Sequence, residues 1–61
     1  MKWEVTEVQA DGSVHPTILT ADKVIISDSG VLMFFDEIED HRSQLVSAYA
    51  MAGWRTCELV E

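Results

Sequence analysis

The chain has 61 residues, 48% of them hydrophobic and 25% charged, and carries a formal net charge of -7. That hydrophobic content excludes a disordered tail, and the length allows one small domain, residues 1–61, close to the lower limit for folding without disulfides or metal ions. Eleven acidic residues against four basic ones disfavour direct binding to nucleic-acid phosphates.

The first two predicted strands form a hairpin. Trp3 and Val5 alternate with polar residues, as in a half-buried strand. Asp11-Gly12 predicts a two-residue type I′ turn, because that turn requires positive φ at both central positions. The resulting register pairs Val5 with Ile18 and Trp3 with Thr20. Pro16 lacks an N–H, so we expect the second strand to lie at a sheet edge.

The next two predicted strands, 22–27 and 31–37, form a second hairpin with a three-residue loop. Gly30 stands where a type I turn followed by a left-handed residue needs it. The register pairs Ile26 with Leu32, Val24 with Phe34 and, on the reverse face, Ile25 with Met33. Both faces of this hairpin are therefore apolar, and both need to be covered.

The last third of the chain admits two interpretations. In the first, 44–50 is a strand, 51–53 a turn and 54–60 a closing strand, with Trp54 and Cys57 on opposite sides. In the second, 39–52 is a helix, which its alanine content favours and Gly53 would end. The alternation Val-Ser-Ala-Tyr and the preceding strands favour the first. We predict an all-β fold, a small antiparallel meander or SH3-like curled barrel of five to six short strands; the alternative is an α+β fold with the helix.

The motifs "ADGS", "ADKV", "SGVLMFFDE" and "SAYAMAGW", with the short final strand, span most of the chain. In these motifs the sequence resembles small β-rich proteins of unknown function from bacteriophages of actinobacteria. The resemblance implies a β-rich fold and a phage origin, and it carries over no functional residue. The acidic stretch from Asp36 to Asp40 departs from the short Asp-Gly turn of that pattern.

An all-β chain leaves one face of the second hairpin without a cover. Exposing Ile25, Met33 and Phe35 forgoes about 1.5 to 3 kcal/mol for each large side chain. We therefore predict that a patch around these three residues meets a partner protein or a second copy of the chain. The charged rim of this patch would consist of Glu37, Glu39 and Asp40.

Candidates for chemistry are few. Carboxylates and an imidazole cluster at Asp36, Glu37, Glu39, Asp40 and His41, but without the spacing of a calcium loop or a second histidine at i+4. No local arrangement joins His15 or His41 to Cys57 or Ser47 as base and nucleophile, and no phosphate-binding glycine motif occurs. We expect no metal, no cofactor and no enzyme activity.

Two further features concern the compartment. Cys57 is the only cysteine, which excludes an internal disulfide and fits a reducing cytoplasm, that of the host if the protein is phage-encoded. No signal peptide or apolar run of about 20 residues is present, so we expect neither processing nor membrane association.

The main functional hypothesis is a small non-enzymatic protein-interaction module that binds a bacterial protein or itself through the apolar hairpin. A second hypothesis is an acidic decoy of nucleic acid that inhibits a nucleic-acid-binding protein. A decoy needs carboxylates with phosphate-like spacing on one side, whereas here they are dispersed along the chain, at Glu4, Glu7, Asp11, Asp22, Asp28 and Glu58. A third is a minor structural component of a particle, which would use the same apolar hairpin for self-assembly.

Overall fold

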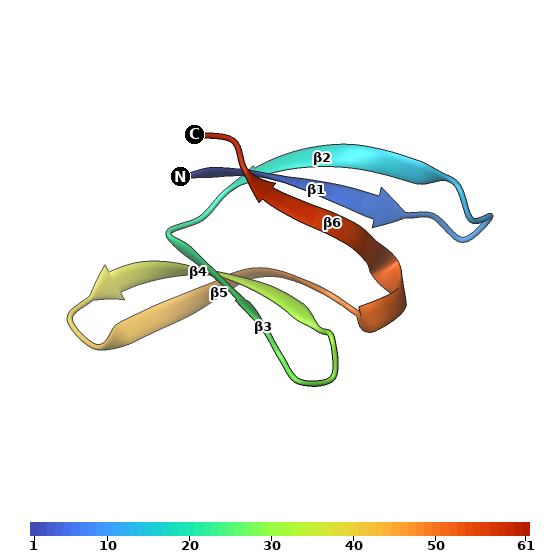
Figure 1. Cartoon of the computed structure of the whole chain (residues 1–61). Helices are drawn as coiled ribbons and strands as arrows, with labels where there is room; N and C mark the ends of the chain where they lie inside the picture. Colours follow the sequence, from blue (N-terminus) through green and yellow to red (C-terminus); the bar gives the residue numbers. More distant parts are fainter.

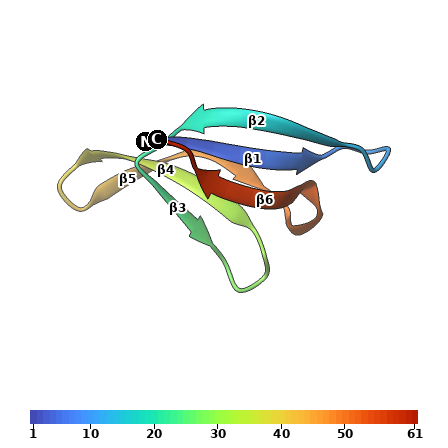
Figure 2. The same cartoon turned by 45° about the horizontal axis from the view of Figure 1, so that its top comes forward.

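The computed structural model describes residues 1–61 as two small antiparallel sheets that face each other (Figures 1 and 2). We call sheet I the one with strand order β2-β1-β6, and sheet II the one with order β3-β4-β5. The strands are β1 (Lys2–Val8), β2 (Val14–Thr20), β3 (Lys23–Ile26), β4 (Leu32–Glu39), β5 (Arg42–Tyr49) and β6 (Trp54–Leu59), and a 3-10 helix, η1 (Met51–Gly53), precedes β6.

The core lies between the two sheets. Its fully buried side chains are Val5, Ala21, Leu32 and Phe34, and the partly buried residues packed against them are Trp3, Leu19, Val24, Tyr49, Trp54 and Cys57. Phe34 lies at the centre, in edge-to-face contact with the rings of Trp3 and Tyr49 at centroid distances of 6.1 and 6.3 Å. The prediction of an all-β fold is confirmed, and sheet II is a meander. The two sheets share no strand pairing, so they do not close into a barrel.

The predicted register of the first hairpin is wrong by one residue. Val5 pairs with Thr17 and Trp3 with Leu19. The loop has three residues instead of two, because Gln9 N–H donates to Ser13 O at 2.7 Å. Within this loop, only Gly12 has positive φ. Asp11 accepts bonds from Ser13 N–H and Oγ–H, which stabilise this longer turn.

A one-residue shift moves every side chain of a strand to the opposite face. Leu19 therefore packs against the core, and Ile18 lies on the outer face of sheet I with 55% of its surface exposed. The edge position of β2 is confirmed, and Pro16 stands where a backbone N–H would point to the free edge.

The second hairpin has the predicted register. Val24 pairs with Phe34, Ile25 with Met33 and Ile26 with Leu32. Ser27 N–H donates to Val31 O, Gly30 N–H donates to Ser27 O, and Gly30 has a φ of 86°, as a type I turn followed by a left-handed residue requires.

The chain after residue 39 is a strand, a turn and a strand, so the alternative of a helix over 39–52 is wrong. One detail of the strand interpretation is also wrong: Trp54 and Cys57 pack against the same core instead of pointing to opposite sides. The reason is a β-bulge. Thr6 pairs with Thr56 and Glu7 with Trp54, which leaves Arg55 as the extra residue and reverses the alternation.

Polar contacts fix the connection between the two sheets and join the sheets themselves. Asp22, in the connection from β2 to β3, accepts a hydrogen bond from Glu37 N–H of β4 at 2.7 Å, and its own N–H donates to Phe35 O. The Trp54 indole N–H donates to Gly30 O at 2.9 Å, which ties β6 to the loop between β3 and β4. The Tyr49 hydroxyl of sheet II donates to Glu7 Oε2 of sheet I at 2.7 Å.

The Tyr49–Glu7 contact predicts a pH dependence of stability. Burial, followed by the hydrogen bond to Glu7, raises the pKa of Tyr49 from 10.0 to about 12. Because the folded state holds this proton more tightly than the unfolded chain, the contribution is complete below pH 10 and is lost as the pH rises from 10 to 12. Tyr49→Phe should cost about 1 kcal/mol at neutral pH and flatten the decline of stability above pH 10.

Urea unfolding across this pH range, compared between the two proteins, would measure the effect. Tyr49 is the only tyrosine, so ultraviolet absorbance of the phenolate reports its titration directly. A phenol that titrates near pH 10 in the folded protein would contradict the prediction.

Candidate protein-binding face

The two faces of sheet II differ in what covers them. Leu32 and Phe34 point into the core and are fully buried, so the alternation of β4 turns Met33 and Phe35 to the other side. Ile25 lies directly opposite Met33 on this side. None of the three packs against the buried core residues. The structure thus brings Ile25, Met33 and Phe35 together on one surface, which we call the outer face.

Strand β5 widens the outer face. Ala48 lies opposite Met33, and a bulge leaves Leu45 and Val46 both opposite Phe35. Leu45 is 54% exposed, and Val46 is also exposed. The sequence patterns did not place these β5 residues on the face, because the hairpin signal pairs β4 with β3 alone. The adjacent pair Leu-Val, which breaks the strict alternation of a strand, is a signal that could have indicated the bulge.

The outer face carries one cation close to its aromatic ring. Lys23 pairs with Phe35 across β3 and β4, and its Nζ lies 5.8 Å from the ring centroid. This distance permits a cation–π interaction, worth about 0.5 to 1 kcal/mol at an exposed site. Lys23 thus places a positive charge next to the aromatic ring of the outer face.

The predicted acidic rim occupies one end of this face instead of encircling it. Glu37 follows Phe35 by two residues and is exposed, on the same side of β4. Glu39 forms an ion pair with Arg42, and Asp40 lies in the turn that joins β4 to β5. In both cartoon views this turn projects beyond sheet I (Figures 1 and 2). Negative charge is thus concentrated at the projecting tip of the hairpin.

Other sequence candidates lie apart. No group of three or more metal-ligand side chains comes together around Asp36 to His41. His15 lies on β2, His41 in the turn between β4 and β5, and Cys57 on β6. Burial, with a smaller effect of the Glu58 charge, raises the pKa of the Cys57 thiol, which favours its unreactive protonated form.

The carboxylates named for a nucleic-acid decoy do not share one surface. Glu4 and Glu58 are direct cross-strand neighbours on sheet I. Glu7 instead pairs with Trp54 and accepts a hydrogen bond from the Tyr49 hydroxyl of sheet II. Asp28 and Asp11 lie in loops of different sheets. A single depression, of about 380 Å³, lies between the chain ends and is lined by Met1, Lys2, Thr20 and Glu61.

Comparison of the chain with protein-family models, with curated proteins and with solved structures gives no match. The resemblance to phage proteins therefore remains a prediction. None of the chain's elements is a helix of the length and apolar character that crossing a membrane requires.

Proposed function

We propose that this protein is a small protein-interaction module whose outer face, on sheet II, binds a partner protein with an apolar surface bordered by basic residues. The observation that carries the proposal is the second apolar side of β4, where Met33 and Phe35 are only half-buried although the other side of the strand fills the core. Leu32 and Phe34 fill the core, while Met33 and Phe35, with Ile25 and Leu45, form a second apolar surface outside it.

The folded chain hides little of its apolar surface. Only four of its 61 residues are fully buried, and its accessible area is 4299 Å², compared with about 4000 Å² for a typical monomer of this mass. Its radius of gyration is 12.0 Å, against about 10.5 Å for a compact chain of this length. A partner that covers the outer face would supply burial that the chain does not achieve alone.

Charge favours a basic partner over a second copy. The net charge is -7, and Lys2 and Arg42, two of the four cations, are engaged in ion pairs with Glu61 and Glu39. Two copies would bring like charges together, whereas a basic surface would be attracted to the acidic tip near Glu37 and Asp40. The apolar contacts would supply affinity, and the tip would increase the rate of association.

The test compares capture of proteins from a nuclease-treated bacterial lysate by three tagged forms: the natural chain, Phe35→Glu and Ile18→Glu. Ile18 is an exposed strand residue on sheet I, so its variant matches the charge change on the other sheet. We expect a stoichiometric partner that is retained by Ile18→Glu and lost with Phe35→Glu. Circular dichroism would establish that both variants are folded.

Two results would contradict the proposal. One is a partner that both variants retain or both lose. The other is a defined oligomer of the natural chain, measured by light scattering, that Phe35→Glu dissociates; the outer face would then be covered by a second copy, as in a structural component of a particle.

A further inference from the structure

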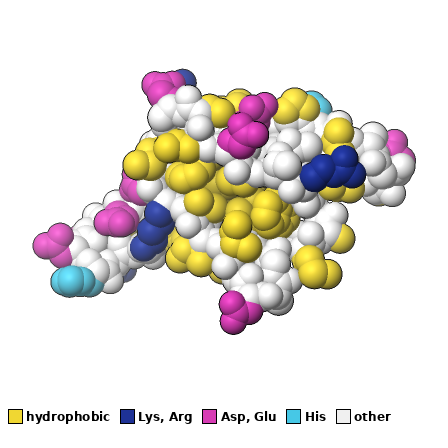
Figure 3. All heavy atoms as spheres, in the orientation of Figure 1, with side chains coloured by type: hydrophobic (Ala, Val, Ile, Leu, Met, Phe, Trp, Pro, Cys, Tyr) yellow, Lys and Arg dark blue, Asp and Glu magenta, His cyan; other side chains and the backbone are white.

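The two sheets are open along one side, where β3 and β6 are the edge strands. Ile26 lies opposite the buried Leu32, and Leu59 opposite Trp3, which packs on the core; both side chains therefore point between the sheets. They are nevertheless 56% and 55% exposed. Figure 3 shows hydrophobic side chains gathered in the middle of this side, between the two sheets. No further strand covers them.

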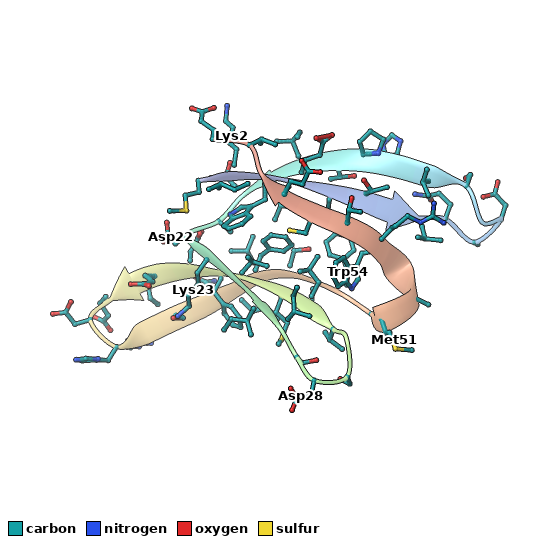
Figure 4. All side chains as sticks on the ribbon, in the orientation of Figure 1. Lys2, Asp22, Lys23, Asp28, Met51 and Trp54 are labelled. Carbon is teal, nitrogen blue, oxygen red and sulfur yellow. The ribbon has the colours of Figure 1, made fainter.

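One end of this opening is closed by the chain itself. The indole of Trp54 reaches from β6 to the loop between β3 and β4 and donates to Gly30 O (Figure 4). Met51 of η1 lies against Gly30. The opening is therefore an exposed apolar strip between β6 and β3 that ends at this contact and packs on the core.

The free edge of β3 has backbone groups available for a new strand. Ser27 N–H donates to Val31 O, which makes Ser27 a hydrogen-bonded position of the β3–β4 ladder. Because such positions alternate along an antiparallel pair, the backbone N–H and C=O of Ile25 point toward β4, and those of Val24 and Ile26 point outward. The side chains of these same two residues point between the sheets. A strand that paired with Val24 and Ile26 would thus place its alternate side chains over the apolar opening.

The cations of the two edge strands favour an occupant with acidic ends. Lys23 and Arg55, the two basic side chains without an ion pair, lie on β3 and β6. Lys23 extends over Phe35 on the outer face, where a residue at the end of a strand added to β3 would stand opposite it. Lys23 at the edge also opposes pairing of β3 with a second β3. We propose that the edge of β3 accepts an extended segment of a partner protein, with apolar residues at alternate positions and acidic residues at its ends, as an added strand of sheet II.

The probe is a synthetic peptide in which valine alternates with threonine and glutamate stands at both ends; a matched peptide has lysine at both ends. Amide hydrogen exchange by nuclear magnetic resonance should show exchange at Val24 and Ile26 slowed at least about tenfold by the saturating acidic peptide. The lysine-ended peptide should bind about tenfold more weakly, the difference shrinking at high salt.

Matched variants locate the site. Ile26→Glu should weaken binding of the acidic peptide at least about tenfold, and Ile18→Glu should leave it unchanged. Both residues lie on edge strands with nearly equal exposure, but only Ile26 points between the sheets. Phe35→Ala, which removes apolar contact area from the outer face without adding a charge beside Lys23, should not affect the peptide, so the two proposals can fail separately.

Three results would overturn the inference. The first is an amide hydrogen-exchange rate at Val24 and Ile26 that saturating acidic peptide leaves unchanged. This result is obtained on the natural chain and needs no variant. The second is equal or tighter binding of the lysine-ended peptide. The third is protection of the same amides that rises with the concentration of the protein alone, which would assign the opening to a second copy.

Discussion

Phe34→Ala is expected to remove most of the folding stability, while Phe35→Ala, at the adjacent residue, leaves the fold intact. Phe34 is fully buried between the sheets and contacts the rings of Trp3 and Tyr49. Truncating such a residue costs about 3 to 5 kcal/mol, and a 61-residue domain has only about 3 to 9 kcal/mol in total. Phe35 lies half-buried on the outer face, so its truncation should cost less, about 1 kcal/mol, which includes the contact with Lys23.

Thermal unfolding followed by circular dichroism would measure the difference. At about 4 to 8 °C per kcal/mol in a domain of this size, we expect Tm to fall by at least about 12 °C for Phe34→Ala and by no more than about 8 °C for Phe35→Ala. The measurement is made at low protein concentration to avoid self-association. Equal losses would contradict the assignment of the two residues to opposite faces.

Gly30→Ala is expected to destabilise the protein more than Gly12→Ala does. Both glycines have a φ of 86°, so alanine incurs about 1 to 2 kcal/mol of left-handed strain at either position. The two sites differ in their surroundings. A Cβ at position 12 meets nothing within 4 Å, whereas a Cβ at position 30 would lie 2.9 Å from Cγ of Met51. Relieving that clash requires the Met51 side chain or η1 to shift and should cost about 1 kcal/mol more.

A double-mutant cycle with Met51→Ala tests the cause. Met51 is 68% exposed, so its truncation alone should change stability little. If the clash is responsible, Gly30→Ala in the Met51→Ala background should cost no more than Gly12→Ala. Equal costs for the two glycine substitutions in the natural background would mean that the Met51 side chain moves aside freely.

The sequence predicted the second hairpin in detail because its signals were local. A loop that ends in Gly30 allows one register, and that register placed Ile25 opposite Met33 on a face separate from Val24 and Phe34. Local signals alone were therefore enough to predict part of the outer face. The predicted register of the first hairpin was wrong because Asp-Gly occurs in hairpin loops of two residues and also in loops of three. The hydrogen bonds from Ser13 to Asp11 stabilise the longer one, which moved Ile18 out of the core.

The sequence by itself determined the strands of the two hairpins, the edge position of β2 through Pro16, and the presence of more apolar strand surface than one small core can cover. Only the tertiary structure decided how that surface is divided. A bulge in β5 places Leu45 and Val46 on the outer face. A second bulge, at Arg55 of β6, places Trp54 on the core side. No further strand covers the side between β3 and β6. The physical reason is that alternation along a strand is a local property, whereas bulges, edges and the pairing of distant strands depend on the fit of the two sheets around Phe34.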